Sequence, residues 1–355
     1  MERAAYRILD ANFNRSREAA RVVEEYCRFV LNSQGLTHRA KSLRHELCRA
    51  IGSLDAGRLI ASRDTAGDVG RTTEDQLPRE TLDNCLTAGC KRLTEALRAL
   101  GETARILNPH LAEALERLRF DAYALEKDIV LSAEPAQKFK GVGLYVIITS
   151  NLPAEIISLA NICALAGADC IQLRAKEMPD GELFAVASVF VRICKDAGAL
   201  SIINDRVDIA VAAGADGVHL GQGDVRVAVV RKLQSGPLII GKSTHSLEQL
   251  RAACDEPITY ASLGPVFATA TKPGAEAVGI EYVSKAAQEL RGKGIAGVAV
   301  GGIGPGNVEA VLSAGADAIA VCSAVTGASD PAGACRELKR RISAFKECQP
   351  QAVLD

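Results

Sequence analysis

Eight short apolar runs, rich in β-branched residues and separated by amphipathic stretches, follow one another through residues 144–347. The runs are LYVIIT (144–149), CIQLRA (170–175), LSIIND (200–205), GVHLG (217–221), LIIGKS (238–243), YASLGPV (260–266), GVAVGG (297–302) and AIAVCSA (318–324). Eight strand–helix units in roughly 200 residues are typical of a closed (β/α)₈ barrel. An open doubly wound sheet is the alternative, but the glycine-rich dinucleotide-binding turn is missing after the first run, which continues as SNLP.

The first part of the chain has the pattern of amphipathic helices. Apolar residues recur at spacings of three, four and seven over about 3–31, 36–51, 79–106 and 110–130. Residues 12–28 also align with 89–105 at a constant offset, which favours two related helical hairpins in a four-helix bundle. We therefore expect an all-helical domain over 1–131, a linker over 132–142 marked by Pro135 and nearby glycines, and the barrel over 143–348.

The composition excludes several classes of partner and site. A formal net charge of −1 gives no bulk attraction to nucleic acid or to an anionic membrane. No apolar run approaches the ~18 residues of a transmembrane helix, and the charged start MERAAYRILD lacks the apolar core of a signal peptide. The 11 cysteines include no C-x-x-C pair, which argues against a disulfide framework and a zinc site. We expect a cytoplasmic protein that binds neither nucleic acid nor membrane.

The second apolar run ends in alternating polar residues. Gln172, Arg174 and Lys176 alternate with apolar neighbours, so period two places all three on one face, toward the mouth of the barrel. Two cations and an amide that converge there suit a polyanion such as diphosphate. The alternative is a solvated strand end, although a parallel barrel strand is normally apolar on both faces.

Carboxylates follow the third and fourth runs. Asn204 and Asp205 end one run, and Asp224 follows the next. Two carboxylates with amides beside them suit Mg²⁺, which takes one or two carboxylates together with substrate phosphate and water. Alternatively, Asp205 caps the helix expected to begin near Arg206. His219 lies within the fourth run, where we expect a packed or hydrogen-bonded residue without a catalytic role.

The later runs end in further groups that suit anions. Ser243 ends the fifth run, and Thr269, Thr271 and Lys272 follow the sixth. The seventh run ends at Gly302, and the eighth ends in Cys322 and Ser323, at positions where this fold often binds phosphate through backbone N–H groups; these residues are therefore candidate substrate ligands. Two anion sites, one metal site and no nucleophile–base pair indicate chemistry that depends on a departing anionic leaving group.

Together these motifs resemble thiamine-phosphate synthase, also called thiamine-phosphate pyrophosphorylase. The resemblance is carried over about 143–345 by QLRAK (172–176), IIND (202–205), GVHLGQGD (217–224), GKSTHS (241–246), GPVFATATK (264–272) and VGGI (300–303). It implies a magnesium-dependent transferase of thiamine biosynthesis. Such an enzyme joins 4-amino-2-methyl-5-hydroxymethylpyrimidine diphosphate to 4-methyl-5-hydroxyethylthiazole phosphate, or its carboxylated form, and releases pyrophosphate.

The resemblance also implies roles for individual residues. The pyrimidine diphosphate contacts are Gln172, Arg174, Lys176, Asn204, Ser243 and Lys272, of which Arg174, Lys176, Ser243 and Lys272 form the catalytic set. The Mg²⁺ ligands are Asp205 and Asp224, and the thiazole phosphate contacts are Thr269, Thr271, Gly302, Cys322 and Ser323. The family reaction is dissociative. Ala175 and Lys242 depart from the residues usual in the family, without removing a ligand.

The helical part resembles a domain fused ahead of this synthase that phosphorylates the pyrimidine monophosphate with ATP. The segments that carry this resemblance are 8–29, RDTAGDVG (63–70) and 90–102. No G-x-x-x-x-G-K-[ST] loop is present, but the loop with Arg63, Asp64, Asp68 and Arg71 could hold phosphate and Mg²⁺; it could equally be a solvated connector. Basic residues on the helices either bind anions or form i,i+4 pairs with glutamates; they are Arg15, Arg21, Lys91, Arg92 and Arg98.

Three functions remain open at this point. The chain is a bifunctional kinase and synthase, a synthase with a helical docking domain, or a barrel of the thiazole-tautomerase type. A homo-oligomer is one open possibility for its assembly. The cations and carboxylates at the strand ends argue against the tautomerase, since it has no diphosphate to bind.

Overall fold

The computed structural model describes residues 2–65, 67–68, 80–233, 236–269 and 276–348, and these divide into two compact units. The first unit ends at Val130 and the second begins at Leu131. Among the described residues, no helix is long and apolar enough to cross a membrane.

The first unit is built from helices. They are α1 (Glu2–Glu25), which continues as the π-helical turn η1 (Tyr26–Val30), α2 (Gln34–Ile51), the short α3 (Ala56–Ala61), α4 (Leu82–Leu107) and α5 (Pro109–Phe139), whose residues from Leu131 onward belong to the second unit. Side chains of Ser33, Asp55 and Thr81 accept hydrogen bonds from the first turns of α2, α3 and α4, which explains why these helices begin there.

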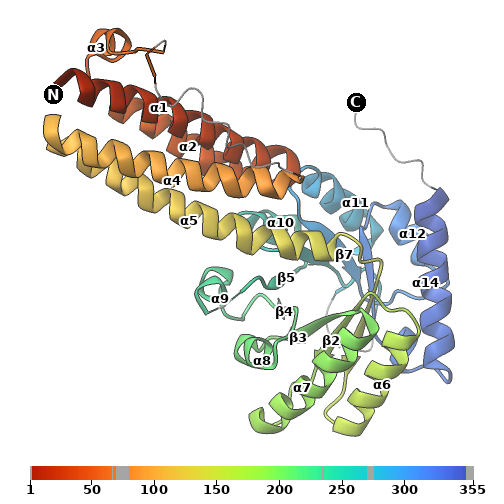
Figure 1. Ribbon diagram of the computed structural model, residues 1–355. Coiled ribbons are helices and arrows are strands. Elements are labelled where there is room, and N and C mark those ends of the chain that lie inside the picture. The colour runs from red at the N-terminus through yellow and green to blue at the C-terminus, as the bar shows by residue number, and fades with distance from the viewer. Residues whose placement is uncertain (1, 66, 69–79, 234–235, 270–275, 349–355) are drawn as a thin grey trace. The chain divides into compact units, whose positions relative to one another are not determined.

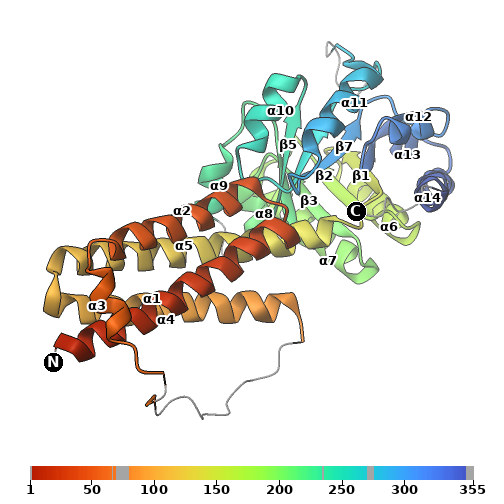
Figure 2. The same ribbon diagram turned by 90° about the horizontal axis from the view of Figure 1, so that it is seen from above.

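The long helices lie side by side and bury one common core (Figures 1 and 2). The core consists mainly of leucines and alanines, among them Leu9, Leu47, Leu97 and Leu115, each fully buried. Helices α1 and α4, which carry the two copies of the sequence repeat, approach closely at Gly89. An added Cβ at this glycine would lie 3.2 Å from Val22. The expected helical bundle is therefore confirmed.

The second unit is a closed barrel of eight parallel strands that pair in sequence order, β1 with β2 through to β8 with β1. The strands are β1 (Leu144–Thr149), β2 (Cys170–Arg174), β3 (Leu200–Asn204), β4 (Gly217–Leu220), β5 (Ile239–Thr244), β6 (Tyr260–Leu263), β7 (Ala296–Val300) and β8 (Ala318–Val321). The predicted (β/α)₈ barrel is confirmed, although several strands end one to three residues earlier than expected. The polar residues that follow these strand ends lie outside the strand pairing and belong to the site described below.

Helices surround the strands (Figure 1). They are α6 (Pro153–Leu165), α7 (Asp180–Ala197), α8 (Val207–Ala213), α9 (Val227–Leu233), α10 (Leu247–Cys254), α11 (Gly279–Leu290), α12 (Val308–Ser313), α13 (Ser323–Thr326) and α14 (Pro331–Cys348). Alternate strand residues such as Val146, Ile171 and Ile240 pack outward against these helices. The other set, including Tyr145, Ile202 and Tyr260, fills the barrel interior, so both faces of the strands are buried.

The segment 132–142, expected to be a linker, is helical as far as Phe139. Pro135 lies inside α5 without ending it. The physical reason is that the end of this helix packs into the barrel unit, where the Phe139 ring stacks on the Tyr260 ring with centroids 4.6 Å apart. Phe139 and Val142 thereby extend the interior core at the amino ends of the strands.

Three identical Gly-Ala-Asp turns lead into β2, β4 and β8, at 167–169, 214–216 and 315–317. Each glycine has a positive φ, which residues with a Cβ rarely adopt, and each turn follows a helix. The aspartates then accept hydrogen bonds from backbone N–H groups of the neighbouring strand, as Asp169 does from Gly143 and Leu144. These turns fix the register on the side of the barrel away from the cavity described next.

Candidate active site

One cavity of about 640 Å³ opens at the carboxyl ends of the strands. Every site residue predicted for the barrel that the structure describes lines it: Gln172, Arg174, Lys176, Asn204, Asp205, Asp224, Ser243, Thr269, Gly302, Cys322 and Ser323. Thr271 and Lys272 lie outside the described residues. The residues that sequence reasoning placed at the ends of seven different strands are thus neighbours around one space, while their individual roles stay predictions.

The cations come from β2 and the loop that follows it. Arg174 is the last residue of β2, and Lys176 lies two residues further on the same side. The Lys176 Nζ lies 3.5 Å from Asp205 Oδ2, across the gap between β2 and β3. The cationic wall and the carboxylates therefore face the same part of the cavity.

The Asp224 carboxyl lies close enough to Asp205 to influence its protonation. Burial raises the pKa of Asp205 above its ordinary value, the neighbouring Asp224 carboxyl raises it further, and the Lys176 ammonium lowers it. Asp205 has a positive φ of 61°, a conformation that is rare and costly for a residue with a side chain. The residue that caps α8 is Arg206, and it makes no side-chain cap bond, so Asp205 is not the helix cap considered above.

This part of the cavity offers two carboxylates, without a third ligand of the same kind. In the portion of the chain that the structure describes, no group of three or more His, Cys, Asp or Glu side chains could hold a metal ion. Any cation here would therefore need oxygens from a ligand or from water, a pattern typical of Mg²⁺ and unlike structural zinc.

The raised pKa of Asp205 predicts how stability depends on pH. Between the ordinary value of 3.8 and the raised pKa, the folded protein binds more protons than the unfolded chain, so its stability falls as pH rises through this window. Asp205→Asn is expected to raise the Tm at about pH 7 in EDTA, and the difference from the parent should disappear near pH 3.8. Thermal unfolding of both proteins across this pH range measures the difference in Tm. An equal or lower Tm for the variant at neutral pH would contradict the prediction.

Lys242 stands where the family usually has a small residue, and it stabilises the loop that carries Asp224. Its side chain is buried on the outer side of β5, and its ammonium donates to the Gly221 carbonyl over 2.9 Å. The Gly221 N–H in turn donates to the Asp224 carboxylate. Gln222 donates from its amide to the Ser243 carbonyl, which ties the same loop to β5.

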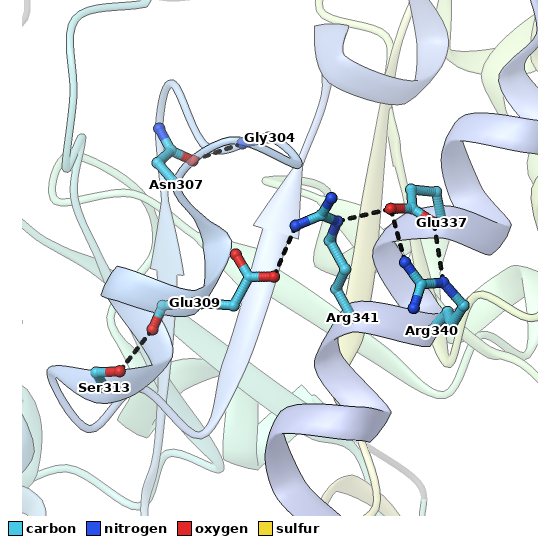
Figure 3. Close-up of polar contacts among 7 residues, drawn as sticks. All are labelled: Gly304, Asn307, Glu309, Ser313, Glu337, Arg340 and Arg341. Carbon is cyan, nitrogen blue, oxygen red and sulfur yellow. Dashed lines mark hydrogen bonds and ion pairs between the residues drawn. The ribbon is translucent and has the colours of Figure 1, made fainter.

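The loop after β7 is shaped by two glycines with positive φ. At Gly302, an added Cβ would lie 2.7 Å from the Ala268 carbonyl oxygen, so the backbone itself forms the cavity wall. Asn307 then holds the loop, because its Oδ1 accepts from Gly304 N–H at 2.9 Å and its Nδ2 donates to the Gly302 carbonyl. Figure 3 shows Asn307 and the helix that follows it.

Helix α12, which follows this loop, is anchored to α14 (Figure 3). Glu309 of α12 and Glu337 of α14 both accept hydrogen bonds from Arg341, over 2.8 and 2.6 Å. Arg340 also binds Glu337. These partly exposed pairs contribute little energy each, but as a network they restrict the position of the helix behind the glycine loop.

A buried chain of hydrogen bonds beneath the cavity was not predicted. The Gln172 Nε2 lies 2.7 Å from the Tyr145 hydroxyl, which lies 2.9 Å from the Tyr260 hydroxyl. His219 follows, with its Nδ1 2.9 Å from the Tyr260 hydroxyl and its Nε2 2.9 Å from the Ser243 Oγ. A sequence signal exists in hindsight, since tyrosines within barrel strands place hydroxyls in an apolar interior where they need partners.

The helical unit pairs several of its candidate cations. Arg21 and Arg98 bind Glu25 and Glu102 at i,i+4 spacing, over 2.8 and 3.5 Å. Lys91 instead binds Glu126 on α5. In the loop after α3, both oxygens of the buried Asp10 carboxylate accept from Arg63, which fixes the start of this loop on α1. Arg71 lies outside the described residues.

A closed parallel barrel with cations, carboxylates and glycine loops around its open end is of the class of (β/α)₈ enzymes that act on phosphorylated small molecules. A thiamine monophosphate synthase family model matches residues 144–325, and a ThiD2 family model matches residues 7–128. The chain belongs to the thiamine-phosphate synthase family.

Its similarity to individual relatives extends over both units. The thiamine-phosphate synthase of Thermosynechococcus vestitus is 36% identical over 342 residues, which cover 95% of each chain. That of Gloeobacter violaceus is 39% identical over 332 residues, which cover 93% of this chain and 94% of the relative. The solved structure of the thiamine phosphate pyrophosphorylase from Pyrococcus furiosus is 34% identical, with a TM-score of 0.54, and covers 59% of this chain and 98% of its own.

Proposed function

We propose that the barrel joins 4-amino-2-methyl-5-hydroxymethylpyrimidine diphosphate to 4-methyl-5-hydroxyethylthiazole phosphate with release of pyrophosphate, or to its carboxylated form with release of both pyrophosphate and carbon dioxide. The observation that carries this proposal is the single cavity in which Arg174 and Lys176 face Asp205 and Asp224, opposite the glycine loop at Gly302. One end of the cavity offers charged side chains for a diphosphate, and the other end offers backbone N–H groups for a monophosphate.

The carboxylates fit Mg²⁺ by their chemistry. Burial and the neighbouring Asp224 carboxyl raise the pKa of Asp205, a cost that a bound divalent cation would offset. When bound, Mg²⁺ would neutralise charge on the diphosphate oxygens. Arg174 and Lys176 would bind the remaining diphosphate oxygens and, with Lys272, stabilise the charge that develops on the leaving pyrophosphate.

The reaction needs no general base from the protein. The bond between the methylene carbon and the diphosphate oxygen breaks with its electron pair on oxygen, and the amino-substituted ring stabilises the resulting cation. The thiazole nitrogen then donates its lone pair to the same carbon. Ser243 and Gln172 would orient the pyrimidine, while Thr269, Thr271, Gly302, Cys322 and Ser323 would hold the thiazole phosphate in line, so positioning supplies much of the rate.

We also propose that the helical unit phosphorylates the pyrimidine monophosphate with ATP, so that one chain makes and uses the diphosphate. The ThiD2 family match over residues 7–128 supports this proposal. Arg63, at the start of the loop after α3, is bound to the Asp10 carboxylate of α1. A docking role for this unit is the competing possibility.

One whole-chain experiment separates these possibilities. In the Asp224→Asn variant the coupling step should be blocked, so incubation with pyrimidine monophosphate, ATP and Mg²⁺ should accumulate the diphosphate, measured by chromatography. The parent chain, given thiazole phosphate as well, should convert the same monophosphate to thiamine phosphate. If the parent couples supplied diphosphate but neither protein forms it from monophosphate, the helical unit is a docking domain.

A further inference from the structure

The direction of the buried hydrogen-bond chain follows from its first donor. The Gln172 amide donates from Nε2 to the Tyr145 hydroxyl, and this favours donation of that hydroxyl's single proton to Tyr260, although the Cys170 thiol is also within its reach. The Tyr260 proton must then go to His219 Nδ1, which accepts it only in the neutral form that carries its own proton on Nε2. That Nε2–H donates to the Ser243 Oγ, and the Ser243 proton remains available to a ligand.

We propose that this chain fixes Ser243 as a hydrogen-bond donor toward the pyrimidine ring, with His219, Tyr260 and Tyr145 as its positioning residues. The inference rests on the proposed coupling reaction for the identity of the ligand, while the direction of the chain does not depend on it. An aminopyrimidine carries ring nitrogens that accept hydrogen bonds, so a serine fixed as a donor recognises one of them. A ring that carries N–H in that position would place its own donor against the Ser243 O–H donor, and it would bind poorly for this reason.

Packing keeps the chain from reversing. A full reversal, in which Tyr145 donates to Gln172, requires the Gln172 amide to exchange its nitrogen and oxygen, and this side chain is only 2% exposed. Tyr145 and Tyr260 are also fully enclosed, and burial raises the pKa of both phenols far above the ordinary value of 10, so each keeps one proton. Phe139 stacks on one face of the Tyr260 ring and the His219 ring is stacked near it, with centroids 4.6 and 5.6 Å away.

Gly241 provides the space that the chain needs. An added Cβ at this position would lie 2.0 Å from the Tyr260 Cζ and 2.4 Å from its hydroxyl oxygen. The Tyr260 side chain therefore occupies the volume that a side chain on β5 would fill. This arrangement places its hydroxyl between Tyr145 and His219, which belong to strands on different sides of the barrel interior.

The tautomer of His219 tests the proposal directly. Nitrogen-15 labelling of the histidines, with assignment by His219→Asn, distinguishes the two neutral tautomers at about pH 8, above the unperturbed imidazole pKa of ~6.5. His245 is an internal reference, because its Nδ1 faces the Gly264 carbonyl and must carry a proton there. The expected spectrum shows His219 protonated on Nε2 and His245 on Nδ1. Protonation of His219 on Nδ1 would overturn the proposal whether or not the protein couples its substrates.

Kinetics of two tyrosine variants test the consequence for binding. Tyr260→Phe removes the donor to His219 and is expected to raise the KM for the pyrimidine diphosphate about tenfold, with the KM for thiazole phosphate unchanged. Tyr145→Phe leaves the Tyr260 donor in place and should raise the KM for the pyrimidine diphosphate less than threefold. Tyr282→Phe, which removes a buried hydroxyl bound to Thr244 outside the chain, is the matched control for a lost tyrosine hydroxyl and should leave the His219 tautomer unchanged.

Two kinetic outcomes count against the proposal. Equal effects of Tyr260→Phe and Tyr145→Phe on the pyrimidine KM would mean that the chain acts only by packing. An unchanged Nε2–H tautomer in Tyr260→Phe, together with an unchanged KM, would mean that Tyr260 does not direct His219. If the parent protein does not couple the two substrates at all, the proposed function fails while the tautomer measurement still decides the chain's direction.

Discussion

Asp224→Asn is expected to lower kcat/KM for coupling by about 10²–10³-fold, the loss typical when one stabiliser of a developing charge is removed. The asparagine keeps an oxygen that can accept from Gly221 N–H, so the loop should stay in place while one negative charge is lost. The expected signature is therefore a higher Mg²⁺ concentration for half-maximal rate and weaker Mn²⁺ binding by calorimetry, with a Tm no lower than that of the parent because a like charge beside Asp205 is removed.

Asp208→Asn provides the control for this measurement. Asp208 lies at the start of α8, three residues after Asp205, but is exposed and bound to Arg206 instead of lining the cavity. The Asp208→Asn substitution should leave the rate and the Mg²⁺ dependence of coupling unchanged. A parent-like rate for Asp224→Asn, or an equal loss in both variants, would contradict the assignment of Asp224 as a metal ligand.

Gly241→Ala is expected to destabilise the barrel unit by about 3 kcal/mol, which corresponds to a Tm lower by roughly 6–12 °C for a unit of this size. The cause is steric, since the new methyl group would overlap the Tyr260 ring, which cannot move because Phe139 stacks on it. Overpacking of this kind shifts side chains and backbone and is among the few mechanisms that give large effects.

Gly181→Ala tests whether the size of this effect comes from the overlap or from loss of a glycine as such. Gly181 lies in the first turn of α7, and an added Cβ there would meet nothing within 4 Å. The substitution should leave the Tm unchanged or raise it slightly, because alanine is the better helix former. A Tm for Gly241→Ala within a degree of the parent would show that the interior of the barrel accommodates the methyl group.

The sequence predicted the barrel because each strand is buried on both faces and is followed by an amphipathic helix, a pattern that few folds share. It also predicted which end carries the site. In Gln172, Arg174 and Lys176 the period of two brings polar groups to one face, and all three line the cavity. The roles of these residues as ligands stay predictions, as does the magnesium site.

The continuation of α5 shows where local signals were insufficient. Pro135 indicated a break, but the packing of Phe139 into the barrel unit stabilises the helix beyond it. Residues 12–28 gave a clearer signal, because the apolar residues Ala19, Val23 and Tyr26 of this segment are buried in the core of the bundle.

The amino-acid sequence by itself determined the number and order of the strands, the helical nature of residues 1–130 and the edge where polar side chains gather, because these depend on periodicity within single segments. Only the tertiary structure decided that Asp205 meets Asp224 and that Tyr145, Tyr260 and His219 connect Gln172 to Ser243. These contacts join strands far apart in the chain, and closure of the barrel sets their distances.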